Sequence, residues 1–268
     1  MLKNDTYVLN VGNEDRERLN LSDQTYGHAT REFIKKLSLK ENIKVLDVGC
    51  GSGNMTHWFS KLVGKNGSVT AVDADIEQVN LTNKIIKDNN LSNVQVYHKS
   101  AYDLDIFEDQ FDIVFCRFLL IHLDNPLIAL KKMKSCLKKN GLLICQEPTT
   151  STHLCMPYFK EFDEANKLTI QLGKQKKVNY DIGLEIYELF SSLNLDNIHL
   201  SFDQPIVSKD NVKIFYMSFN QIKEQILENK LADNYTVENI LNGLLTLEKS
   251  SSHIVAGFRS TLICGRNS

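Results

Sequence analysis

The stretch that most constrains the fold is KVLDVGCGSGN, residues 44–54. It is a short apolar run around an acid, Asp47, and it continues into glycines at alternate positions, Gly49, Gly51 and Gly53. Glycine adopts positive φ angles readily and carries no Cβ atom, so a turn built from it lets a ligand approach the backbone closely. The pattern therefore predicts a strand, a tight turn against which a ligand lies, and then a helix.

The spacing of these glycines excludes two common nucleotide motifs. A dinucleotide fingerprint needs G-x-G-x-x-G, but its third glycine would fall on Asn54 or Thr56. No Gly-Lys-Ser/Thr follows, so the phosphate loop of nucleotide hydrolases is excluded as well. The helix after the turn offers free N–H groups that suit a carboxylate as well as a phosphate, and Asp47 suits an ammonium group. Together these features match an amino-acid zwitterion.

A second acid narrows the ligand further. Asp73 ends the strand VTAVD, where a carboxylate accepts hydrogen bonds from both hydroxyls of a ribose. The alternative is that Asp73 caps the helix that follows. Its position after the glycine turn favours the ribose. S-Adenosylmethionine combines a ribose, an adenine and an amino-acid zwitterion without a phosphate, and it is the cofactor that we expect.

Short apolar strands alternate with amphipathic helices from residue 44 to 148, which predicts a mainly parallel sheet with helices on both faces. Expected strands are 44–49, 69–73, 94–100, 111–116, 142–147, 197–202 and 254–265. Expected helices run from about 13 onward and over 54–64, 75–90, 125–141, 157–173 and 181–193, with two more between 210 and 251. We expect one domain with helical additions.

Composition places the chain in a broad class. The chain has 268 residues and a formal net charge of -2, which gives no sign of a nucleic-acid partner. The six cysteines form no CxxC pair and are expected to be reduced thiols of a cytoplasmic protein. The polar opening is unlike a signal peptide, no apolar run reaches membrane-spanning length, and no metal-ligand spacing stands out.

Several segments together resemble the class I S-adenosylmethionine-dependent methyltransferases. They are VLDVGCGSG, VTAVDAD, VYHKSAYDL, FDIVFCRFLLIHLDNP and LKKNGLLICQEP, within residues 44–148. A looser match to bacterial small-molecule methyltransferases includes the opening YVLNVGNEDRERLNLSDQ and the ending VAGFRSTLICGR. The resemblance implies a Rossmann-like, doubly wound sheet of about seven strands. It also implies a helical lid in 1–43, a cofactor-binding core in 44–148, and substrate-side helices and last strands in 149–268.

The resemblance also assigns site residues. Asp47, Gly49, Gly51 and Gly53 would surround the methionine part of the cofactor, and Asp73 would bind the ribose. The other implied contacts are Ala74 beside the adenine, Ala101 and Tyr102 after the third strand, Arg117 after the fourth, and Tyr7, Arg18 and Gln24 in the opening segment.

Some of these further contacts depart from the family's pattern or have an alternative role. The family usually has an acid before Ala101, but here that residue is Ser100, so the backbone N–H of Ala101 and Tyr102 must do more of the adenine recognition. Arg117 could instead make a structural ion pair. Tyr7, Arg18 and Gln24 could instead lie on a solvated amphipathic helix.

A sulfonium is already an activated leaving group, so the expected reaction is direct, in-line methyl transfer to a small-molecule acceptor. His122 and Glu147 are the candidate general bases, with packing or capping as the alternative for each; His153 is a weaker candidate. CRFLLI after the fourth strand is not the Asn/Asp-Pro-Pro-Tyr motif of enzymes that methylate amide or base nitrogens. No Pro-Cys pair marks a cytosine-modifying thiol.

The identity of the acceptor stays open at this point. The helices of residues 210–251, with 1–43 and the segment after Glu147, are expected to roof the cleft, and Phe215, Tyr216 and Phe219 either line an apolar pocket or pack in the helix core. The acceptor atom is an oxygen, a nitrogen or a carbon. A non-catalytic scaffold or regulatory protein that binds S-adenosylmethionine is the rival interpretation. The sequence predicts no oligomeric state.

Overall fold

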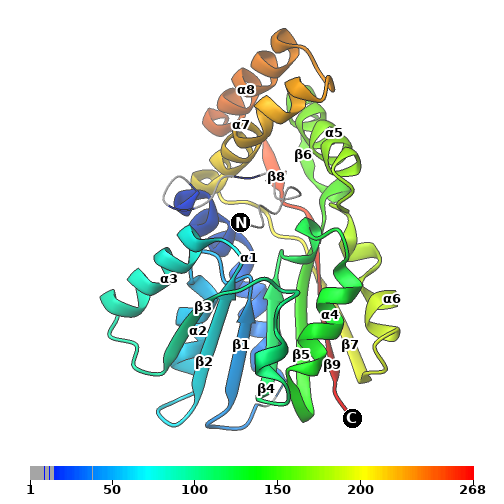
Figure 1. Cartoon of the computed structure of the whole chain (residues 1–268). Helices are drawn as coiled ribbons and strands as arrows, with labels where there is room; N and C mark the ends of the chain where they lie inside the picture. Colours follow the sequence, from blue (N-terminus) through cyan, green and yellow to red (C-terminus); the bar gives the residue numbers. More distant parts are fainter. Residues whose placement is uncertain (1–8, 10–11, 13–14, 38) are drawn as a thin grey trace.

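The computed structural model describes residues 9, 12, 15–37 and 39–268. Its centre is a seven-stranded sheet in the order β3-β2-β1-β4-β5-β9-β7 (Figure 1). Strands β1 to β5 are parallel, and β9 runs antiparallel between β5 and β7. The strands are β1 (Lys44–Val48), β2 (Ser68–Asp73), β3 (Val94–His98), β4 (Phe111–Arg117), β5 (Leu137–Thr149), β7 (Asp196–Asp203) and β9 (Arg259–Arg266). The predicted Rossmann-like, mostly parallel sheet of about seven strands is confirmed.

Helices cover both faces of this sheet, as the alternating pattern predicts. The apolar side chains of α1 (Arg16–Lys35), α2 (Asn54–Leu62) and α3 (Ile76–Asp88) pack on one face, with Phe59 meeting Phe115 of β4 at its centre. Helices α4 (Pro126–Ser135) and α6 (Ile186–Ser191) pack on the other face. Both faces are therefore buried, which explains the nearly continuous apolar runs of the parallel strands.

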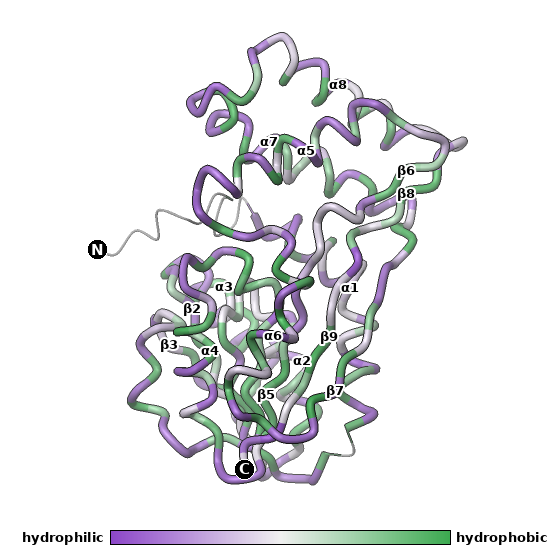
Figure 2. The backbone as a smooth tube through the Cα atoms, turned by 90° about the vertical axis from the view of Figure 1, so that its right-hand side faces the viewer, coloured by the Kyte–Doolittle hydropathy of each residue, from purple (hydrophilic) through white to green (hydrophobic). Residues whose placement is uncertain are grey.

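A helical unit stands beyond the carboxyl ends of the parallel strands (Figures 1 and 2). It consists of α5 (Lys160–Gln175), α7 (Lys213–Glu228) and α8 (Asn234–Lys249), which pack on one another. A two-stranded antiparallel sheet of β6 (Leu154–Met156) and β8 (Ile254–Ala256) connects it to the rest of the chain. The apolar core is continuous from the α4 face of the sheet into this unit.

The structure differs from the expected elements at three places. Helix α4 ends at Ser135, because Leu137 already pairs with Phe111 of β4 and begins a strand of thirteen residues. The helix expected over 181–193 is divided into the 3-10 turn η5 (Ile182–Leu184) and a short α6, and Asp181 accepts a hydrogen bond from the N–H of Ser151. The predicted last strand is divided at Gly257 into β8 and β9, and β6 was not predicted.

Residues 9, 12, 15–37 and 39–268 contain neither a helix that could span a membrane nor a cluster of metal-binding side chains. None of their helices is long and apolar enough to cross a membrane. Nor do they contain a group of three or more His, Cys, Asp or Glu side chains placed to hold a metal ion. All six cysteines are free and buried.

Candidate functional site

The candidate site lies where the strand order reverses. Strand β1 pairs with β2 on one side and with β4 on the other, so the chain leaves the carboxyl ends of β1 and β4 in opposite directions. Open α/β sheets bind their ligands in the crevice that this reversal creates. The glycine turn follows β1 directly and thus lies at this crevice.

All three glycines of the turn adopt positive φ angles: +72° at Gly49, +53° at Gly51 and +80° at Gly53. The N–H groups of Gly49 and Cys50 both donate to the carbonyl oxygen of Val72 on β2, at 2.8 and 3.0 Å. An L residue in this conformation is strained by roughly 1–2 kcal/mol, so the turn requires glycine. The turn also holds backbone that carries no side chains at the edge of the crevice.

The space above the glycines is shaped by neighbouring side chains. A Cβ atom at Gly49 would lie 2.9 Å from a methyl carbon of Leu119, and one at Gly53 would lie 2.9 Å from the hydroxyl of Thr82. Gly51 is more open toward the described part of the chain, in which its nearest neighbour, Leu19 of α1, would be 3.7 Å away. The middle glycine is therefore the one whose missing side chain leaves room for a ligand.

Asp73, at the end of β2, faces the glycine turn. Its carboxylate accepts hydrogen bonds from the N–H of Gly51 at 2.9 Å and the N–H of Asp75 at 3.0 Å. Burial raises its pKa. An ionised carboxylate accepts about four hydrogen bonds, so capacity for ligand hydroxyls remains. Asp75 caps α3 through the N–H groups of Glu77 and Gln78. The carboxylate of Asp73 instead binds the glycine turn through the N–H of Gly51.

Asp47 lies beneath the turn. It is 2% exposed, and the hydroxyl of Thr56 on α2 donates to its carboxylate at 2.6 Å. Burial raises the pKa of Asp47 to about 6. Asp47 is thus bonded to the helix that follows the turn, a contact that was not predicted from the sequence. This hydrogen bond fixes the start of α2 against β1.

The expected adenine contacts follow the ends of β2 and β3. Ala74 is exposed, and Ala101 is buried in the sheet core. The hydroxyl of Tyr102 donates to the carboxylate of Asp124 at 2.7 Å, and its N–H donates to the hydroxyl of Ser100 at 3.2 Å. Ser100, which replaces the usual acid, therefore orders the turn that carries Tyr102.

Glu147, at the end of β5, is completely buried. Its carboxyl group accepts hydrogen bonds from the backbone N–H groups of Leu119 and Leu120 at 2.9 Å each and of Ile121 at 3.4 Å. Burial raises its pKa to about 8, although these amide donors act in the opposite direction. These contacts favour the capping alternative over a general base.

Of the two candidate histidines, His122 is buried and His153 is half-buried. His122 ends the 3-10 turn η3 (Leu120–His122), with its ring edge-on to Tyr180 at 6.3 Å. Burial, and secondarily the charge of Arg18, lowers the pKa of His122 to about 3. His153 shares a hydrogen bond of 3.0 Å with Asn166, and burial lowers its pKa to about 4. Both rings are therefore neutral near pH 7, and the contacts of His122 favour its packing alternative.

Arg117 makes the ion pair that was its alternative role. Its guanidinium lies 2.8 Å from the carboxylate of Asp23 on α1, and the same carboxylate lies 2.6 Å from Arg31. A Cβ atom at Gly27 would collide with both Asp23 and Arg31, so this glycine leaves space for the cluster. Asp23 was not among the predicted site residues. Its spacing from Gly27 and Arg31, four residues each along one helix face, was the available signal.

The remaining predicted contacts lie in the opening segment. Arg18 is buried and binds the carboxylate of Asp15 at 2.5 and 2.6 Å. Gln24 is exposed on α1. Tyr7 lies outside the described residues. The residue of α1 that lies near the glycine turn is Leu19, which was not predicted as a contact. The side chain of Gln24 faces solvent.

An aromatic cluster extends from the end of β4 into the helical unit. Phe118, which follows β4, packs edge-on against Tyr26 of α1 and Phe258 at 5.3 and 5.1 Å. Phe258 stands 5.3 Å from the ring of His153, which stands 5.3 Å from Phe215 of α7. Phe118, Phe258, His153 and Phe215 are all half-buried. The rings therefore form a continuous apolar path away from the crevice.

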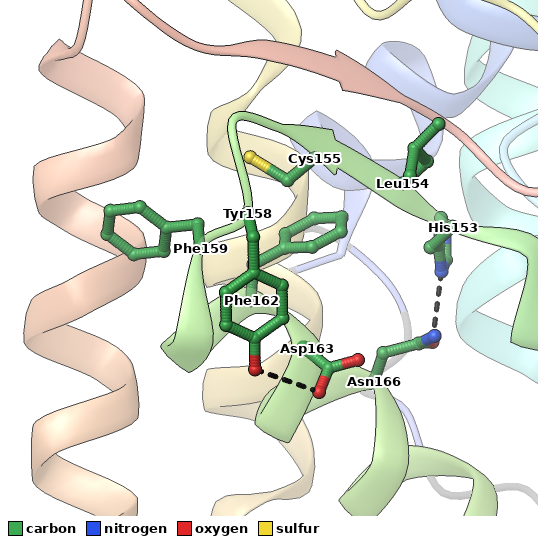
Figure 3. Close-up of a pocket in the computed structure, with 8 residues that line it drawn as sticks. All are labelled: His153, Leu154, Cys155, Tyr158, Phe159, Phe162, Asp163 and Asn166. Atoms are coloured by element: carbon green, nitrogen blue, oxygen red, sulfur yellow. Dashed lines mark hydrogen bonds between the residues drawn. The ribbon is translucent and has the colours of Figure 1, made fainter.

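A small cavity of about 70 Å³ adjoins this path between β6 and α5 (Figure 3). His153 and Asn166 hydrogen-bond at one side of it, and the ring of Phe162 lies between them and Tyr158. Of the three aromatic residues predicted on α7, Phe215 contacts the rings of His153 and Phe162, whereas Phe219 is 2% exposed and packs in the core.

Comparison with known proteins identifies the family. The sequence profile of the methyltransferase domain family matches residues 22–200. The chain belongs to this family. The matched range holds the glycine turn, Asp73, Arg117 and Glu147, and the seven-stranded sheet is the class I methyltransferase fold.

Individual relatives cover less of the chain. The demethylmenaquinone methyltransferase of Staphylococcus aureus is 32% identical over 131 residues, which are 49% of this chain and 52% of that protein. The chain thus spans about half the length of the curated relatives that it matches.

Among solved structures, the YcgJ protein of Bacillus subtilis superposes with a TM-score of 0.62 at 20% identity, covering 90% of this chain and 98% of that one. A phosphoethanolamine N-methyltransferase of Haemonchus contortus, solved with S-adenosylhomocysteine, superposes with a TM-score of 0.56 at 14% identity, covering 90% of this chain and 53% of that one. These two likenesses concern the fold alone.

Proposed function

We propose that this chain binds S-adenosylmethionine at the glycine turn and transfers its methyl group directly to a small-molecule acceptor. The observation that carries the proposal is the turn itself, in which the bare backbone of Gly51 is hydrogen-bonded to Asp73 at the point where the strand order reverses. Membership of the methyltransferase domain family supports the reaction. The S-adenosylhomocysteine bound to the Haemonchus enzyme of the same fold supports the cofactor.

The residues of the site suit the parts of this cofactor. The open face of Gly51 admits the methionine part against the backbone, near the N-terminus of α2. Asp73 has acceptor capacity left for the two ribose hydroxyls. When bound, the sulfonium supplies an activated methyl group, so the task of the chain is to hold an acceptor in line with it and to exclude water.

The aromatic cluster supports an acceptor with an apolar part. Its half-buried rings lead from Phe118, at the carboxyl end of β4, to His153 and Phe215 beneath the helical unit. Half-buried aromatic surface offers contact area to a ligand at little entropic cost.

The acceptor atom is an oxygen, a nitrogen or a carbon. His122 and Glu147 were the candidate general bases, and the contacts of both favour structural roles. The expected cytoplasmic location and the lack of nucleic-acid and membrane partners remain predictions, as does the division into lid, core and substrate-side segments.

Two measurements test the proposal. Calorimetry should detect binding of S-adenosylmethionine and S-adenosylhomocysteine, but not of NADH. Incubation with isotopically labelled S-adenosylmethionine and a cell metabolite extract should yield S-adenosylhomocysteine and a labelled product one methyl group heavier. Binding without any turnover would favour the scaffold interpretation, and no binding would overturn the proposal.

A further inference from the structure

The segment that follows β4 is tied to Glu147 by three successive backbone N–H groups. Those of Leu119 and Leu120 donate to one carboxyl oxygen, and that of Ile121 donates to the other. We infer that Glu147 is a positioning residue whose carboxyl group fills this nest of amides and thereby fixes the segment that shapes the methionine end of the site. The inference rests on the proposed function.

The backbone of the segment explains why the three N–H groups converge. Phe118 has a φ of +54°, a conformation that L side chains rarely adopt, and Leu119 returns to the right-handed region at -100°. Leu119 directly precedes η3, so the N–H groups of Leu119, Leu120 and Ile121 stand at the start of that turn and point into one concavity, which suits the oxygens of a carboxyl group. The N–H of Phe118 donates to the carbonyl of Gln146 at 2.9 Å, so the nest opens directly toward the next residue of β5, Glu147.

The fixed segment touches the candidate site on two sides. The side chain of Leu119 lies on the bare face of Gly49, where a Cβ atom would be only 2.9 Å from it. The ring of Phe118 packs against Tyr26 and Phe258 of the aromatic cluster. One short turn therefore contacts both the proposed cofactor side and the proposed acceptor side. Glu147 acts on these surfaces through Leu119 and Phe118, without reaching the ligands itself.

Removing the carboxyl group should release the turn. Glu147 is fully buried, so an alanine there leaves three inward-facing N–H groups without acceptors and a space of the size of acetate. With S-adenosylhomocysteine as the probe, we expect calorimetry on Glu147→Ala to show a dissociation constant raised about tenfold or more. Sodium acetate at tens of millimolar should restore much of the affinity, whereas sodium chloride at equal ionic strength should not.

A matched control is Asp112→Asn at the opposite end of β4. Asp112 also accepts a hydrogen bond from a backbone N–H, that of Lys44 at 2.8 Å, but it lies far along the strand from the glycine turn. Its replacement should leave the affinity unchanged and insensitive to acetate. Where Glu147→Ala does not fold, Glu147→Gln carries the test, because it keeps the length but sets an NH₂ group against the amides. Its affinity should fall less, and acetate should have no effect.

A double-mutant cycle tests whether the effect passes through Leu119. If it does, Glu147→Ala should lower the affinity by a smaller factor in a Leu119→Ala background than in the wild type. Additive effects, or unchanged affinity in both Glu147 variants while the wild type binds the probe, would overturn this inference and leave the proposed function standing. Absence of binding by the wild type would overturn the proposed function first.

Discussion

Asp23, on α1, lies 2.8 Å from Arg117 at the carboxyl end of β4. The same carboxylate pairs with Arg31 at 2.6 Å, and the three side chains are only 12 to 24% exposed. Burial acts to raise the pKa of Asp23, but the two guanidinium groups outweigh it and hold that pKa below its ordinary value. A charged cluster thus fastens α1, the helix whose Leu19 lies at the glycine turn, to the strand end that borders the candidate site.

Replacing Asp23 by asparagine should destabilise the fold. The substitution leaves two partly buried guanidinium groups without a carboxylate, and we expect a loss of about 1–3 kcal/mol in the free energy of unfolding. Because the folded pKa is lowered, the stability from Asp23 is present above its unfolded pKa and is lost as the pH falls through the folded one. Urea unfolding measures both effects.

A control for this substitution is Asp105→Asn, which breaks an ion pair with Lys132 on the surface. That pair is solvated, so its loss should change the free energy of unfolding far less. Equal losses in the two variants would mean that the Asp23 cluster does not hold α1.

Gly51→Ala should weaken cofactor binding more than its backbone strain explains. Both Gly51 and Gly64 have positive φ angles, +53° and +73°, and no residue that the structure describes lies close to where a Cβ atom would stand on either. Alanine at either position should therefore lower the free energy of unfolding by roughly 1–2 kcal/mol. Only Gly51→Ala should also reduce S-adenosylhomocysteine affinity in calorimetry. Equal affinities in the two variants would place the ligand elsewhere.

Local sequence signals were sufficient for the sheet and the turn. The alternation of apolar runs with helical patterns predicts the parallel strands, because strands buried on both faces cannot alternate in polarity. A helix was predicted to begin at residue 75, and Asp75 does cap α3, since capping depends on a few neighbouring residues. The positive φ angles of the three glycines follow from the same local chemistry.

Contacts between segments that are far apart in the sequence could not be predicted from these local signals. Asp23 meets Arg117 across 94 positions of sequence, and Glu147 meets the amides of residues 119–121 through the adjacency of β4 and β5. The early end of α4 has the same origin, because pairing of Leu137 with Phe111 overrides a helical pattern that continues to Gly141. In each of these cases, contacts that form only in the folded chain determine the local structure.

Asp73→Ala should lower the affinity for S-adenosylhomocysteine about tenfold or more, because the ribose would lose a charged acceptor. Asp75→Ala is the matched control two residues away. Its loss removes the cap of α3 and should cost about 1 kcal/mol of stability without changing the affinity. Calorimetry with thermal unfolding separates the two effects. Unchanged affinity in Asp73→Ala would contradict the ribose assignment.

Glu147→Gln should change how stability depends on pH. The pKa of Glu147 rises on folding from an ordinary value of 4.5 to about 8, so between these values the native state holds a proton that the unfolded state releases. The stability from this group is therefore full below pH 4.5 and is lost as the pH rises to about 8. Asp47, His122 and His153 titrate in both proteins, and their contributions cancel when the variant is subtracted from the wild type. Urea unfolding of both proteins from pH 5.5 to 9 should show this difference fall with pH up to about 8 and then level off; parallel curves would mean that Glu147 keeps its charge in the folded protein.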